Sequence, residues 1–110
     1  MTRLCTPLIL LLFVAAGIPT LQAASVEEIR KSAGQGDSAS QFSLAQRYEA
    51  GEGVERDPTK AAQWYGKAAR QGHARAQTNL GNLYRSGQGV SQDFGEALGW
   101  YRKAAAQGDT

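Results

Sequence analysis

The chain has 110 residues, of which 42% are hydrophobic and 20% are charged, so it has room for no more than one small domain. Its 12 lysines and arginines and 10 acidic residues give a net charge of +2, with no basic stripe that would indicate nucleic-acid binding. The single cysteine, Cys5, excludes an internal disulfide, and its place near the N-terminus argues against a cysteine-ligated metal site or cysteine nucleophile.

The first element in chain order has the three-part pattern of a secretory signal peptide. Arg3 gives a positive start, Leu8–Ile18 is an apolar run, Pro19 interrupts it, and small residues follow from Ala23. A membrane-spanning helix needs about 18–20 apolar residues, and this run is shorter. We therefore expect residues 1–23 to be a cleaved signal peptide. The mature chain would then have no stable membrane span and would be periplasmic or secreted.

The rest of the chain repeats itself at an interval of 36 residues. These residues coincide at that offset: Leu44 and Leu80, Tyr48 and Tyr84, Gly51 and Gly87, Gly53 and Gly89, Asp57 and Asp93, Ala61 and Ala97, Trp64-Tyr65 and Trp100-Tyr101. Agreement at aromatic, glycine and acidic positions together indicates two full units, over residues 37–72 and 73–108. Residues 24–36 align with the second half of a unit and are expected to form a capping half repeat.

Each unit begins with a predicted helix, over residues 38–50 in one unit and 74–86 in the other. Leu44 and Tyr48 are four residues apart and therefore share one helix face. Gly51 follows the last apolar turn, where a helix that ends in the left-handed conformation favours glycine.

A second helix follows in each unit after a short loop. Asp57 is a typical N-cap residue and Pro58 is suited to the first helical position. Asp93 is the matching N-cap in the other unit. The apolar positions of this helix in the first unit follow helical spacing: Ala61, Trp64, Tyr65, Ala68 and Ala69. Both tryptophans, Trp64 and Trp100, are therefore expected in the core.

This pattern resembles the Sel1-like repeat, a relative of the tetratricopeptide repeat. The residues that carry the resemblance are Leu80-Gly81, Tyr84, Gly87, Gly89-Val90, Asp93, Ala97, Trp100-Tyr101, Lys103-Ala104-Ala105 and Gln107-Gly108. The resemblance implies an all-α fold, a short α-solenoid of antiparallel helix pairs after the signal peptide. It also implies a scaffold or adaptor role, often in bacterial envelope or secreted proteins.

The motifs that could carry chemistry favour structural roles. The glycine-rich loops at residues 51–56 and 87–92 lack the third glycine and the preceding strand of a dinucleotide site. His73, the only histidine, stands where other copies of the turn have aspartate, so it is expected to cap the next helix. We predict no catalytic residues, no cofactor and no metal site, and therefore no enzymatic activity.

The surface left for a partner is the first helix of each pair, which lines the concave face in tetratricopeptide-like folds. The candidate partner-binding residues are Phe42, Gln46, Glu49, Arg75, Thr78, Asn82 and Arg85. The two arginines could pair with a carboxylate or an acidic peptide segment, and Phe42 could serve as an apolar anchor. The alternative is an ordinary solvated face, with Phe42 packed against the half repeat.

Two functions remain open. The first is a protein- or peptide-binding adaptor in the cell envelope. The second is a structural subunit that pairs with a second copy, as a homodimer, or with a larger partner. Repeat arrays usually need about three units, and the chain stops where a third would begin. The apolar side of Ala97, Trp100 and Ala104 is expected to lack a neighbour there.

Overall fold

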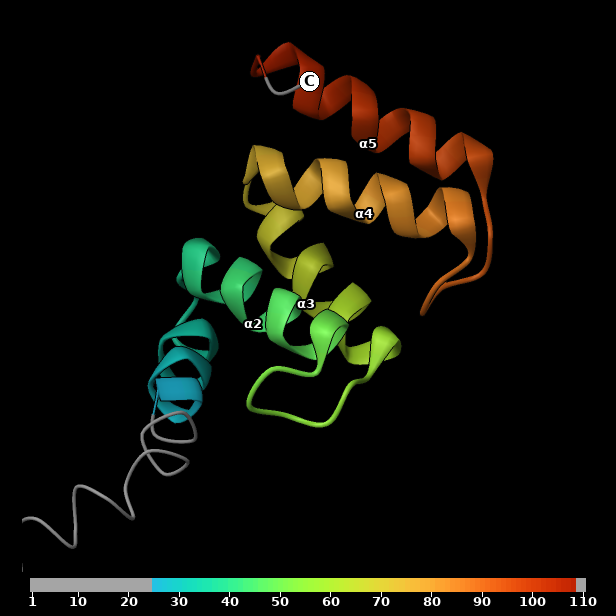
Figure 1. Ribbon diagram of the computed structural model, residues 1–110. Helices are drawn as coiled ribbons and strands as arrows, with labels where there is room; N and C mark the ends of the chain where they lie inside the picture. The colour runs from blue at the N-terminus through green and yellow to red at the C-terminus, as the bar shows by residue number, and fades with distance from the viewer. Residues whose placement is uncertain (1–24, 109–110) are drawn as a thin grey trace, which may run out of the picture.

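The computed structural model describes residues 25–108, which form helices joined by turns and short loops (Figure 1). The predicted signal peptide lies outside these residues. Residues 25–34 are helical, and the elements that follow are α2 (Ser38–Ala50), α3 (Pro58–Arg70), α4 (Ala74–Ser86) and α5 (Phe94–Ala106). None of the helices in the described part of the chain is long and apolar enough to cross a membrane.

The helices stack in chain order as antiparallel pairs, α2 with α3 and α4 with α5, and α3 also packs on α4 (Figure 1). This arrangement is the predicted all-α solenoid. Small residues at the seams let the helix backbones approach closely, and larger side chains fill the wider gaps. The buried core comprises Val26, Ala33, Phe42, Leu44, Ala45, Tyr48, Ala61, Ala62, Tyr65, Ala68, Ala69, Ala76, Leu80 and Leu83.

Local capping chemistry sets the helix ends and confirms the sequence-based expectations. The Asp57 carboxylate accepts a hydrogen bond from the Lys60 backbone N–H at 3.1 Å, and Asp93 does the same for Glu96 at 3.0 Å. His73 caps α4, with Nδ1 accepting from the Ala76 N–H at 3.1 Å. Each cap satisfies one of the N–H groups that have no partner inside the helix.

A buried glutamine joins three helices in each unit. Gln77 donates to the Ala69 carbonyl at the end of α3 (3.0 Å) and accepts from the Gln107 side chain at the end of α5 (2.9 Å). In the first unit, Gln41 donates to the Ala33 carbonyl and accepts from the side chain of the equivalent C-terminal glutamine. Because a buried amide without partners is costly, these bonds fix the position of each helix pair on the preceding helix.

The loop of the second unit packs on the start of α3. Gly89 has φ +73°, and a Cβ atom there would lie 2.1 Å from the Pro58 carbonyl oxygen. Only glycine combines this backbone conformation with so close an approach. Val90 follows and is half-buried against the core, so the loop holds the two units in one register.

The C-terminal end of the solenoid differs from the expectation. Ala97 and Ala104 are buried, and Trp100 is half-buried, so the prediction that this side lacks a neighbour was wrong. The large apolar side chains that remain exposed on α5 are Phe94, at 66%, and Leu98, at 49%.

The reason is that each second helix has two packing faces. Ala97 and Ala104 lie on the face that meets the first helix of their own unit, α4. Leu98 is the equivalent of Ala62 in the first unit. Ala62 lies on α3 and is buried, and α3 packs against α4 of the following unit. The open face of α5 is therefore the one that a following repeat would cover.

Candidate partner-binding surfaces

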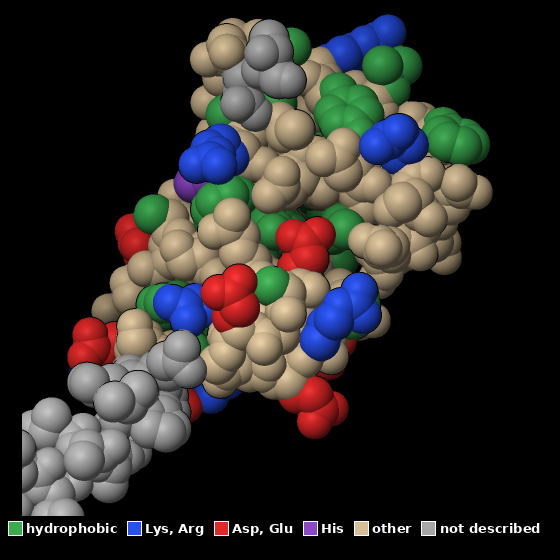
Figure 2. All heavy atoms as spheres, viewed as in Figure 1, with side chains coloured by type: hydrophobic (Ala, Val, Ile, Leu, Met, Phe, Trp, Pro, Cys, Tyr) green, Lys and Arg blue, Asp and Glu red, His purple; other side chains and the backbone are tan. Residues whose placement is uncertain are grey.

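The predicted partner-binding residues lie on the first helices of the two units. We call the surface formed by Phe42, Gln46, Glu49, Arg75, Thr78, Asn82 and Arg85 the α2–α4 face. Figure 2 shows separate basic and acidic side chains on the visible side of the molecule, the acidic ones in its middle and lower parts, with no continuous stripe of either sign. Recognition at such a surface depends on individual side chains.

Phe42 belongs to the packing of this face. Its ring is 7% exposed and stacks on His73, with 4.7 Å between the ring centroids and 22° between the planes. It also meets Tyr65 of α3 at a centroid distance of 5.7 Å. The Arg75 guanidinium lies over Phe42, 5.3 Å from the ring centroid. Phe42 therefore positions Arg75 through a cation–π contact and presents little apolar surface of its own.

Two other predicted residues bind tyrosines of their own unit. The Tyr65 hydroxyl donates to Glu49 Oε1 at 2.7 Å, and the Tyr101 hydroxyl donates to Asn82 Oδ1. Burial, followed by the bond to Glu49 and its negative charge, raises the pKa of Tyr65. Glu49 and Asn82 thus hold the second helices in place, and part of their hydrogen-bonding capacity is already used.

The remaining residues of the α2–α4 face are more open. Arg75, Arg85 and Gln46 are exposed, and Thr78 is half-buried. Within residues 25–108 the one ion pair joins Arg30 to Glu27 at 2.6 Å, so neither arginine of α4 is neutralised by a carboxylate there. The positive charges of α4 are therefore available to a partner.

The two tryptophans, expected in the core, pack against it from its edge. Trp64 and Trp100 are half-buried and pack against the core with part of their surface. Lysine ammonium groups lie over both rings, Lys67 4.4 Å from the centroid of Trp64 and Lys103 4.5 Å from that of Trp100. These pairs place aromatic and positive surface side by side.

The polar groups that could take part in a reaction are used as helix caps. His73, Asp57 and Asp93 each accept a backbone N–H of the following helix. No three His, Cys, Asp or Glu side chains of the described residues gather as metal ligands would.

A second surface, which the sequence pattern did not predict, is a hollow that we call the α3–α5 groove. It is a hollow of about 440 Å³ between α3 and α5, with α4 and the loop before α5 closing it. Its lining includes Ala62, Gly66, Lys67, Arg70, Tyr84 and Trp100. The sequence feature that could have indicated the groove is a difference between repeats. Ala62 and Gly66 are smaller than the equivalent residues of the half repeat, Val26 and Arg30.

A family model described as Sel1 repeat matches residues 38–73 and 74–109. No curated protein matches the chain.

Similar solved structures include a protective antigen of uropathogenic Escherichia coli with an SLR fold (37% identity, TM-score 0.77). A Sel1 repeat protein from Oxalobacter formigenes (40%, 0.78) and cysteine rich protein B of Helicobacter pylori (27%, 0.74) are also similar. The matches cover 79%, 79% and 76% of this chain, and 19%, 36% and 63% of the respective relatives. The chain therefore spans less than two thirds of each of these proteins.

Proposed function

Because this chain belongs to the Sel1 repeat family, whose members are typically protein-interaction scaffolds, we propose that it is an exported adaptor that binds another protein or peptide in the bacterial cell envelope. The Sel1 repeat is generally a non-catalytic scaffold fold, and we propose no enzymatic activity for this chain. Its partner would be a protein and not a nucleic acid, since its charges are nearly balanced and interspersed.

The observation that carries this proposal is the pair of exposed, unneutralised arginines on α4. Arg75 is held over the Phe42 ring, and Arg85 lies in the last turn of the same helix. A guanidinium held in place loses less entropy when it pairs with a carboxylate. We propose that the α2–α4 face, with Gln46, Glu49, Thr78 and Asn82 beside these two, contacts the partner.

The test is selection of peptides by the purified protein, followed by charge reversal. Random peptides that bind the full chain are isolated and their affinities are measured for the wild type and for Arg75→Glu/Arg85→Glu. We expect the double variant to bind peptides that contact the α2–α4 face about tenfold or more weakly, because electrostatic attraction becomes repulsion at two positions. Lys31→Glu/Arg102→Glu is the matched control, since it changes the net charge equally elsewhere. Unchanged binding by the α4 variant would refute the assignment of this face.

Export is a separate part of the proposal. We propose that residues 1–23 are removed as a signal peptide, leaving residues 24–36 as a capping half repeat before the units 37–72 and 73–108. Mass spectrometry of the protein recovered from the periplasm or medium measures its N-terminus directly. We expect it to begin at or near residue 24; recovery only in the cytoplasm with residues 1–23 attached would contradict export.

A second candidate function is self-association through the end of the solenoid. Phe94 and Leu98 support it, because they are large apolar side chains that are exposed to solvent. They lie on the face of α5 that a following repeat would cover. Hydrophobic side chains are visible over α5 in Figure 2. Light scattering gives the molar mass that distinguishes a dimer from a monomer.

A further inference from the structure

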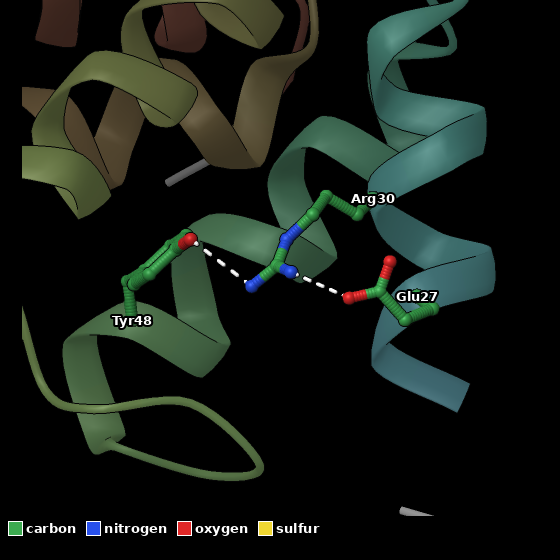
Figure 3. A network of polar contacts seen from close by, with 3 residues as sticks. All are labelled: Glu27, Arg30 and Tyr48. Atoms are coloured by element: carbon green, nitrogen blue, oxygen red, sulfur yellow. Dashed lines mark hydrogen bonds and ion pairs between the residues drawn. The ribbon is translucent and has the colours of Figure 1, made fainter. Parts of the chain in front are cut away.

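Two equivalent hollows lie where a second helix, the following first helix and its loop meet. In the first, the side chain of Arg30 crosses from the N-terminal helix towards α2. Its Nη2 lies 3.4 Å from the Tyr48 hydroxyl and its Nη1 lies 2.6 Å from Glu27 Oε1 (Figure 3). The space beside Tyr48 is therefore partly occupied by the protein's own charged side chain.

The second hollow, the α3–α5 groove, has no arginine at the position equivalent to Arg30. At the same offset of 36 residues, Gly66 matches Arg30, which lines the first hollow, and Ala62 matches the buried Val26. Tyr84, the counterpart of Tyr48, makes no side-chain hydrogen bond to any residue in the described range. The groove has a volume of about 440 Å³, compared with about 370 Å³ for the hollow beside Tyr48, and a free phenol hydroxyl in its lining.

The charges that line the two hollows also differ. The hollow beside Tyr48 has two cations, Arg30 and Lys60, and two carboxylates, Glu55 and Asp57. The positive and negative charges in its lining are therefore equal in number.

The α3–α5 groove has cations alone. Lys67 and Arg70 line it and no carboxylate does, and neither cation has an ion pair within residues 25–108. The Arg70 guanidinium folds over Gly66, with Nη1 3.3 Å from the place where a Cβ atom would be. The missing side chain of Gly66 thus makes room for a guanidinium in the groove.

The rest of the lining is largely apolar or aromatic. Ala62 and Leu80 are buried, and Val90, Tyr84 and Trp100 are half-buried. Such a surface can receive an aliphatic or aromatic side chain, while charged groups at its edge fix the orientation of the ligand.

We propose that the α3–α5 groove binds an acidic segment of a partner protein. One apolar side chain of the segment enters beside Tyr84 and Trp100, and flanking carboxylates pair with Lys67 and Arg70. A nucleic acid is the less favoured occupant, because the two cations are not continued into an extended basic surface. The inference rests on the proposed protein-binding function and adds a surface other than the α2–α4 face.

The test uses a random peptide library selected on the full chain, with binding then measured for Lys67→Glu/Arg70→Glu. We expect the wild type to enrich peptides in which Asp or Glu flanks Leu, Ile or Phe. The double variant should bind them about tenfold or more weakly. The control, Lys31→Glu/Arg102→Glu, makes the same change in net charge and should bind them as the wild type does.

A second variant separates occupation of the groove from general attraction. Gly66→Arg copies the arginine that lines the first hollow, and the three atoms nearest to a Cβ atom at position 66 all belong to the flexible side chain of Arg70. The variant adds positive charge, so attraction alone would strengthen binding of an acidic peptide. Occupation of the groove predicts weaker binding instead, and tighter binding would overturn the proposal.

The outcomes also separate this proposal from the function on which it rests. If the selected peptides lose binding only in Arg75→Glu/Arg85→Glu, the chain is a peptide binder but the groove is not its site. If the wild type enriches no peptides, the peptide-binding function fails and the inference falls with it. An oligothymidylate probe that binds as tightly as the selected peptides, and loses binding in Lys67→Glu/Arg70→Glu, would overturn the assignment of an acidic protein segment.

Discussion

Tyr65 combines complete burial with a hydrogen bond to a carboxylate, which couples the stability of the fold to pH. Burial and Glu49 raise the pKa of its phenol group in the folded chain. A raised pKa contributes stability that is fully present below the pKa of the unfolded chain, about 10 for tyrosine. That contribution is lost as the pH rises further, because the unfolded chain then releases a proton that the folded chain keeps.

We therefore expect the free energy of unfolding to fall above about pH 10, and to fall less steeply in Tyr65→Phe. At neutral pH the variant should be less stable by about 1.5 kcal/mol or more, since it loses one hydrogen bond to a charged group. Urea denaturation followed by circular dichroism across this pH range measures both effects. Equal alkaline losses in the two proteins would contradict the assignment to Tyr65.

Single residues could be predicted from the sequence where their role is local. The caps at Asp57, Asp93 and His73 depend on an acceptor placed just before a helix, and all three were confirmed. The bonds of Gln41 and Gln77 depend on partners in other helices. No local pattern indicates such partners, so the buried glutamines were missed.

At the scale of the element, the predicted first helices coincide with α2 and α4, because apolar spacing and a following glycine define their ends. What the sequence could not show is which glycines are required by packing. Gly89 lies against the Pro58 carbonyl, whereas a Cβ atom at Gly99, inside α5, would meet nothing within 4 Å. The two glycines should therefore respond in opposite ways to the same substitution.

We expect Gly99→Ala to stabilise the protein by up to about 1 kcal/mol, because alanine has the higher helix propensity. Gly89→Ala should destabilise it by about 1 kcal/mol or more, since a side chain is disfavoured at its positive φ and collides with the backbone. Thermal unfolding of the two variants beside the wild type measures the difference. A loss of stability in Gly99→Ala would mean that α5 is covered at that position in solution.

At the scale of the whole molecule, the repeat pattern predicted the solenoid but not the faces it leaves open. The open face of α5 and the α3–α5 groove both depend on how one helix packs against two neighbouring helices. Ala97 was expected to be exposed and is buried, whereas Leu98, one position later, is exposed. The α3–α5 groove arises similarly, because small residues on α3 matter only once α5 lies opposite them.

The open face of α5 leads to the last prediction, which concerns assembly. An exposed pair of large apolar side chains on one helix face favours association, because pairing removes apolar surface from water. We expect the wild-type chain to show a molar mass by light scattering that rises with concentration towards that of a dimer. Leu98→Glu should remain a monomer at the same concentrations, since a charge would have to be buried in the contact.

Gln88→Glu provides the control, because it adds the same negative charge at an exposed position in the loop between α4 and α5. If this variant associates like the wild type while Leu98→Glu does not, the α5 face mediates the contact. If both variants remain monomers, added negative charge alone prevents association, and the α5 face is not specifically involved. A wild type that stays monomeric at all concentrations would refute self-association and leave the α2–α4 face and the α3–α5 groove as the surfaces by which the chain acts.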